Sequence, residues 1–203
     1  EVRAGNFKYA PPTGYLAMCT SNLSTPTIKK PGDYFNTVLY TGNGGTNAIT
    51  GVGFQPDLVW AKVRSAGYSH GMFDSVRGAT KKISSNLAYQ EVTLSGLTAF
   101  GSDGFTMGSD DGTNESDSTY VAWNWLAGTA PTADNSASAG ATPTAGSVKI
   151  DGSNLGSGLA GTIAATRLSA NTTSKFSIVK YEGTGSAATI GHGLGVAPDL
   201  IIV

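Results

Sequence analysis

The chain has 203 residues, a formal net charge of −1 and only 13% charged residues. Nucleic-acid binding needs a clustered basic footprint, and the isolated pairs Lys29-Lys30 and Lys81-Lys82 do not make one. No apolar run approaches the ~20 residues of a membrane-spanning helix. Cys19 is the single cysteine, so no intrachain disulfide supports the fold. We therefore expect neither a nucleic-acid partner nor membrane insertion.

Residues 1–33 predict an extended segment. Pro11-Pro12 and Pro26 favour extended, non-helical backbone, and the apolar residues between them are too many for a free linker. We interpret this stretch as an arm or as the end of a preceding domain.

Residues 35–60 are repeated from residue 176 onwards. With a shift of 141, Phe35 and Tyr40 correspond to Phe176 and Tyr181, and one extra residue near His192 moves the shift to 142. Ten identities fall in about 26 positions, and turn residues and apolar residues match at the same places. A period of this length is typical of duplicated domains and is too long for a solenoid unit.

Each copy predicts the same local structure. Residues 37–40 form a β-branched and aromatic run, and the glycine-rich turn 42–45 tolerates positive φ. A second short strand carries Ala48-Ile49, and residues 58–63 predict a third strand, apolar enough to be buried on both faces. Its counterpart starts at Asp199 and the sequence stops at Val203, so we expect the chain to be a fragment of something longer.

Residues 34–127 predict one complete module. After the third strand, residues 69–76 alternate enough for a strand, and the Asp103-Gly104 step between apolar runs indicates a hairpin. Residues 120–126 alternate strictly, with Val121, Trp123 and Trp125 on one face. No segment shows sustained helical periodicity. Because the module instead has many short strands with such turns, it is predicted to be a β-sandwich.

Residues 128–147 contain no aromatic residue and predict a linker or a loosely held surface loop. Two further candidate strands, 148–150 and 163–168, lead into a second, truncated module over residues 148–203. The predicted fold class is therefore all-β: tandem β-sandwich-like modules joined by a Gly/Ala/Ser/Thr-rich linker.

Several motifs taken together resemble a repeated module of tailed-phage structural proteins, familiar from marine and freshwater phages and prophages. They are FNTVLYTGNG (35–44), FQPDLVWAK (54–62), FDSVRGATK (73–81), GSDGFTMGSD (101–110), YVAWNW (120–125) and SANTTSKFSIVKY (169–181). The opening NFKYAPPTGYLAMCTSNL (6–23) resembles the exit of a SPRY-like, concanavalin-type lectin domain that precedes the module there.

This resemblance implies a virion protein of a tail fibre or appendage that supports attachment to a host surface glycan. It carries over no catalytic residue and no cofactor, so we expect no enzyme. It also implies a homotrimer, with residues 1–33 packed on a neighbour and with other tail proteins as partners. The alternatives are a capsid decoration protein and a glycan depolymerase, which would need two carboxylates about 5 to 9.5 Å apart.

His70, Asp74, Ser75 and Arg77 suggest a nucleophile–base arrangement, but their spacing argues against it. On a strand over residues 69–76, His70 and Asp74 share a face but lie roughly 13 Å apart, too far for a hydrogen-bonded pair. Arg77, beside Gly78, is expected to donate to loop carbonyls. No catalytic residue is therefore assigned.

Two other groups are candidate binding sites. An acidic loop could bind Ca²⁺ through several oxygen ligands, but it lacks the EF-hand order, and a solvated loop without an ion is the favoured expectation. Its acidic residues are Asp110, Asp111, Glu115 and Asp117, with Asp103 nearby. Trp60, Trp123 and Trp125 could stack on sugars, but sandwiches normally bury such residues, so a core position is the favoured expectation. His192 is expected to be a turn residue.

Overall fold

The computed structural model describes residues 12–15 and 24–203 of the chain. The expected lectin-like exit and most of the expected arm, residues 1–11 and 16–23, lie outside the described residues. The described part is almost entirely β-structure, which confirms the predicted fold class. None of its helices is long or apolar enough to cross a membrane.

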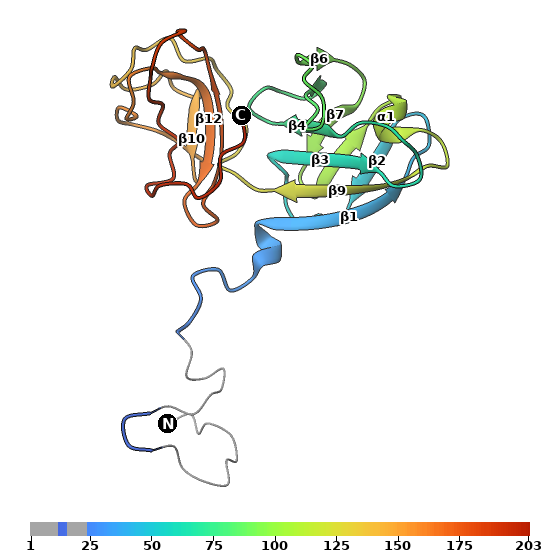
Figure 1. Ribbon diagram of the computed structural model, residues 1–203, viewed down its shortest axis with the longest axis horizontal. Coiled ribbons are helices and arrows are strands. Elements are labelled where there is room, and N and C mark those ends of the chain that lie inside the picture. The colour runs from blue at the N-terminus through green and yellow to red at the C-terminus, as the bar shows by residue number, and fades with distance from the viewer. Residues whose placement is uncertain (1–11, 16–23) are drawn as a thin grey trace.

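The strands of the described residues form four sheets, in the orders β1-β9-β3-β4, β2-β8-β7, β5-β6 and β11-β10-β12-β13. In chain order the elements are η2 (Pro31–Asp33), β1 (Phe35–Thr41), β2 (Asn47–Thr50), β3 (Leu58–Val63), β4 (Gly71–Asp74), β5 (Lys81–Lys82), β6 (Val92–Thr93), β7 (Leu97–Gly101), β8 (Gly104–Met107), α1 (Asp111–Asn114), β9 (Thr119–Trp125), β10 (Val148–Ile150), β11 (Ser153–Asn154), β12 (Ala165–Asn171) and β13 (Phe176–Tyr181). Figure 1 shows two bodies side by side, with β1 to β9 in one and β10 to β13 in the other.

The first body is a sandwich of the β1-β9-β3-β4 sheet and the β2-β8-β7 sheet. Its core takes side chains from both sheets, among them Val59, Phe73, Phe105 and Met107. The predicted hairpin is present, with Phe100 opposite Phe105 in the antiparallel pair β7–β8. The predicted alternating strand is β9, which pairs with β1 on one side and β3 on the other.

The face of β9 that is buried was predicted wrongly. Tyr120, Ala122 and Asn124 are fully buried in the sandwich, whereas Trp123 and Trp125 are half-buried on the outer face. Both faces of β9 are apolar, so alternation alone identifies the two faces but not the inward one. The space between the sheets is already filled by Tyr120, Phe73 and the β8 side chains.

Asn114 fixes the glycine-rich turn between β1 and β2. Its Nδ2 donates to the carbonyls of Gly45 and Gly108, both at 2.7 Å, and its Oδ1 accepts from Asn47 Nδ2 at 2.9 Å. Gly42 is needed because a Cβ there would lie 2.1 Å from the carbonyl oxygen of Glu115. The turn therefore packs directly on the segment after α1.

The second body packs a smaller core against the β11-β10-β12-β13 sheet, around Val148, Leu168 and Leu194. The loop 128–147 has no strand, as expected, but it is not loosely held. Asn135 donates from its backbone to Thr166 O and from Nδ2 to Ala165 O, and its Oδ1 accepts from Thr144 N. Side-chain hydrogen bonds hold this segment in place, although it has little apolar surface to bury.

The two copies of the repeat share part of their structure. β1 corresponds to β13, and the turn glycines Gly44 and Gly185 have φ of 69° and 71°. The copies differ in the third strand. β3 is paired on both sides, with β9 and β4, whereas residues 200–203 form no strand and are exposed. The prediction of a strand there was wrong for the described structure, in which no strand of residues 12–15 and 24–203 pairs with residues 199–203.

Candidate functional site

The junction between the two bodies centres on the Asp57 carboxylate, at the start of β3. Asp57 is 1% exposed, and its Oδ1 accepts from Ser75 Oγ at 2.6 Å. Its Oδ2 accepts from the backbone N–H of Ala127 at 2.8 Å and of Thr129 at 3.2 Å. One buried carboxylate thus connects the start of β3, the exit of β4 and the chain that leaves β9.

The electrostatics of Asp57 are set mainly by burial. Loss of solvent raises the pKa of the Asp57 carboxyl above its usual range, while the hydrogen bonds from Ser75, Ala127 and Thr129 oppose that rise. Asp74 nearby adds a smaller upward contribution to the pKa. The site is structural in character, because the carboxylate is buried and both of its oxygens accept hydrogen bonds from the surrounding segments.

Further contacts connect the first body to β12 and β13. Ser169 Oγ accepts from Gly128 N at 2.8 Å and donates to Thr129 O at 2.7 Å. A Cβ at Gly128 would lie 2.4 Å from the carbonyl oxygen of Ala170, so the linker passes β12 with no room for a side chain. The Trp125 and Phe176 rings stack with centroids 5.9 Å apart. Together these contacts make the junction a packed interface.

The three predicted tryptophans lie together on the outer face of the β1-β9-β3-β4 sheet. The Trp60 ring lies 5.9 Å from that of Trp123, in an edge-to-face arrangement, and 6.5 Å from that of Trp125. Trp60 Nε1 donates to His70 Nδ1 at 2.8 Å, which fixes both rings. We call Trp60, Trp123 and Trp125 the aromatic face.

Exposed apolar side chains continue the aromatic face along β1. Phe35 is 39% exposed and Leu39 is 64% exposed.

The pKa of His70 is lowered by burial and, to a smaller extent, by the charge of Lys62. The imidazole is therefore neutral at pH 7, which suits its role as an acceptor from Trp60.

The acidic loop is not gathered into an ion site. No three His, Cys, Asp or Glu side chains in residues 12–15 and 24–203 lie close enough to share a metal ion. Asp110 accepts from Thr113 Oγ1, Glu115 accepts from Tyr68 and Ser118, and Asp117 accepts from Ser116. Local hydrogen bonds thus use these carboxylates separately. Asp111 is exposed in the first turn of α1, and Asp103 accepts from the N–H groups of Gly51 and Gly53.

The Asp74–Arg77 group is also structural. Arg77 Nε lies 2.6 Å from Asp74 Oδ2, and the same guanidinium donates to Met72 O and to Glu91. His70 is hydrogen-bonded to Trp60 and not to Asp74 or Ser75, so these residues form no nucleophile–base pair. His192, in the second copy, accepts from the N–H of Leu194 two residues on.

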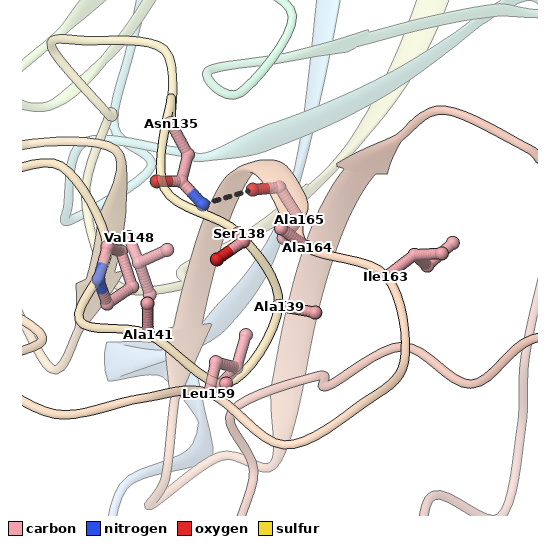
Figure 2. A pocket seen from close by; sticks show the side chains of 11 residues that line it. Asn135, Ser138, Ala139, Ala141, Val148, Leu159, Ile163, Ala164 and Ala165 are labelled. Atoms are coloured by element: carbon pink, nitrogen blue, oxygen red, sulfur yellow. Dashed lines mark hydrogen bonds between the residues drawn. The ribbon is translucent and has the colours of Figure 1, made fainter.

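A shallow pocket lies where the loop 128–147 meets the second body (Figure 2). Ala141, Val148 and Leu159 contribute apolar side chains to it, and Asn135 supplies an amide that is already bonded to Ala165 O. Its lining contains no titratable side chain, so the pocket itself offers no side chain for acid–base chemistry and no base beside the Ser138 hydroxyl.

These features define an all-β protein of tandem modules with a packed junction. The profile of a family described as a domain of unknown function (DUF7483) matches residues 30–152 and again residues 150–203, so the chain belongs to that family. No curated protein and no solved structure is detectably similar to the chain.

The residues that hold the junction were not predicted from the sequence. Asp57 is one of the repeated residues, with Asp199 as its counterpart, but the repeat does not indicate which groups bond to it. Ser75, Gly128 and Ser169 carry no local signal, because their roles depend on contacts between segments far apart in the chain.

Proposed function

We propose that this chain is a structural and adhesion protein of a phage virion, in a tail fibre or tail appendage, where its modules form a stiff spacer. The observation that carries the proposal is the packed junction between consecutive modules. Asp57, Gly128 and Ser169 fix the path of the linker, and Trp125 stacks on Phe176. A spacer that holds a receptor-binding end away from a particle needs such fixed geometry between its units.

Two further observations support a role without catalysis. The acidic-loop carboxylates of Asp110, Glu115 and Asp117 are used in separate local hydrogen bonds, and the pocket in Figure 2 has no titratable lining. The low charge of the chain suits packing of chains side by side, because few charges need to be kept in water.

The adhesive part of the proposal concerns the aromatic face. Trp60 and Trp123 lie on an outer sheet surface, which is the placement that stacking on a sugar requires. Trp125 is less available, because Phe176 covers its ring. A glycan array on the 203-residue chain, compared with its Trp60→Ala and Trp123→Ala variants, tests this contact. Binding that both variants retain would place the contact elsewhere.

Antibody labelling of purified virions tests the role itself. Antibodies raised against the 203-residue chain should mark the tail fibres or another tail appendage in electron micrographs. Label spread over the capsid would instead support a decoration protein, and particles without any label would reject a virion role.

Incubation of the chain with host capsule or lipopolysaccharide should leave the polymer length unchanged. Shortening of the polymer would support the depolymerase alternative.

A further inference from the structure

One edge of β1 is not covered by any other strand of the described residues. In the sheet β1-β9-β3-β4, β1 is an edge strand of seven residues, Phe35–Thr41. The backbone carbonyl of Tyr34 accepts from Leu126 N, and Gly42 N donates to Ser118 O, so the even-numbered residues face β9. The odd-numbered residues therefore direct their N–H and C=O groups away from β9.

These outward groups are mostly unsatisfied within residues 12–15 and 24–203. Thr37 N donates to the neighbouring Asn36 Oδ1, and Thr41 O accepts from Asn47 Nδ2. The N–H and C=O of Leu39 have no partner in the described part of the chain. The middle of β1 thus offers an open set of ladder hydrogen bonds.

The second copy of the repeat shows how this edge pairs. β13 corresponds to β1 with the shift of 141, so Phe176 and Ile178 correspond to Phe35 and Thr37. Ala170 O accepts from Asp151 N, and Leu168 N donates to Ser147 O, so the even residues of β12 face β10. Its odd residues face β13, opposite Phe176 and Ile178.

The edge that is open in β1 is therefore the edge that β12 occupies, antiparallel, on β13. In the first copy the residues equivalent to β12, 24–30, form no strand. The same strand of the repeat thus has a paired edge in one copy and an open edge in the other.

β1 carries none of the devices that normally protect an exposed edge. It contains no charged residue and no proline, and its register with β9 runs from Phe35↔Trp125 to Thr41↔Thr119 without a bulge. The side chains of Phe35 and Leu39, both exposed, lie beside this edge on the outer face of the sheet. Such an edge favours the addition of another β-strand.

We propose that two copies of this chain associate through this edge, with β1 of one pairing antiparallel with β1 of the other. The strand is compatible with itself, since pairing about Val38 places Thr37 opposite Leu39 and Phe35 opposite Thr41, with no like charges opposed. The two sheets then join into one, and the exposed Leu39 side chains gain apolar neighbours. This two-fold pairing gives a dimer in place of the trimer that the resemblance implies, and it does not depend on the proposed virion role.

Sedimentation of the 203-residue chain over a range of concentrations tests the proposal. Wild type should show a monomer–dimer equilibrium. Leu39→Pro removes an N–H that faces away from β9, so the β1–β9 ladder is kept while two inter-chain hydrogen bonds are lost. We expect the dimer dissociation constant to rise about thirtyfold.

Two further variants separate edge pairing from misfolding and from general stickiness. Leu39→Lys keeps the whole backbone and should also weaken the dimer, because lysine protects edges. Leu200→Lys is the matched control, since Leu200 is 76% exposed but lies in no strand, and it should dimerise as wild type does. A wild-type monomer at all concentrations, a trimer, or a dimer that both Leu39 variants retain would overturn the proposal.

Hydrogen exchange provides a second readout on the same samples. In the dimer the Leu39 amide should become protected as concentration rises, while the Val38 and Tyr40 amides, which face β9, should be protected throughout. A Leu39 amide that exchanges equally fast at every concentration would also contradict edge pairing.

Discussion

The contacts of Asp57 at the junction predict how its replacement by asparagine changes the stability of the chain. Asp57→Asn can keep every contact if the amide oxygen takes the place of Oδ2 and accepts from Ala127 and Thr129. The amide nitrogen then donates to Ser75 Oγ, whose hydroxyl can reverse its direction. The asparagine therefore resembles the protonated aspartic acid.

The expected pH dependence follows from the raised pKa of Asp57. A group whose folded pKa lies above its unfolded value contributes its full stability below the unfolded pKa, near 3.8, and that contribution is lost as pH rises through the folded pKa. Wild type should match Asp57→Asn at acidic pH and fall below it at neutral pH. The gap should be about 1.4 kcal/mol for each unit by which burial raises the pKa.

Asp57→Ala should destabilise the chain at every pH, because it leaves the buried Ala127 N–H and the Ser75 hydroxyl without an acceptor. Each unsatisfied group costs about 1–3 kcal/mol, so we expect a loss of roughly 2–4 kcal/mol. A loss of that size lowers Tm by roughly 4–16 °C in a chain of this length.

Chemical denaturation from pH 3.5 to pH 8, with fluorescence of the tryptophans as the signal, measures these differences. Asp199→Asn is the matched control, since Asp199 is the repeated counterpart of Asp57 and is exposed, and it should change little. The reasoning is refuted if wild type is more stable than Asp57→Asn by a margin that grows with pH. In that case the three hydrogen bonds lower the pKa of the Asp57 carboxyl by more than burial raises it.

The remaining predictions concern four other positions. The pKa of the Asp103 carboxyl is lowered by the N–H groups of Gly53 and Gly51, so its contribution to stability is present above the unfolded pKa and is lost as pH falls through the folded pKa. Asp103→Asn should therefore be less stable than wild type at neutral pH, and this difference should disappear on acidification in the same denaturation series. Asn114→Ala should cost roughly 2–4 kcal/mol, because buried carbonyls lose their donor, and thermal unfolding measures it. Gly42→Ala should lower Tm or prevent folding, since the new Cβ meets a backbone oxygen at 2.1 Å, and soluble yield with circular dichroism reports it. Phe176→Ala should cost about 1 kcal/mol and loosen the junction, detected as a larger radius of gyration in X-ray scattering.

The sequence predicted the local structure better than the contacts between segments. The hairpin around Asp103-Gly104, the strand at 120–126 and the turn glycines each have a local signal, and each is present. The inward face of β9 could not be predicted, because both of its faces are apolar. The strand at 199–203 was predicted because these residues repeat the start of β3, but a strand also needs neighbours to pair with.

For the candidate sites too, contacts between distant segments could not be predicted from the sequence. Arg77 was predicted to donate to loop carbonyls, but its guanidinium donates to the carbonyl of Met72 within β4 and to the carboxylates of Asp74 and Glu91. The acidic loop looked like one group in the sequence, yet Asp110 and Glu115 bond to different partners. Asp57 and Ser169 gain their roles only when segments about 70 and 40 residues away reach them. Such long-range contacts leave no pattern within a window of sequence.

The Asp57 junction also determines how a pulling force would pass along the chain. Tension applied to the second body reaches the linker at Thr129, and Asp57 holds Thr129 and Ala127 beside β3 and the exit of β4. The load is therefore shared by the sheet instead of being concentrated on the last residues of β9. Because the Asp57, Gly128 and Ser169 contacts must give way together, the linker should resist extension until the junction breaks as a unit. A row of such modules would behave mechanically as a rod with stiff joints.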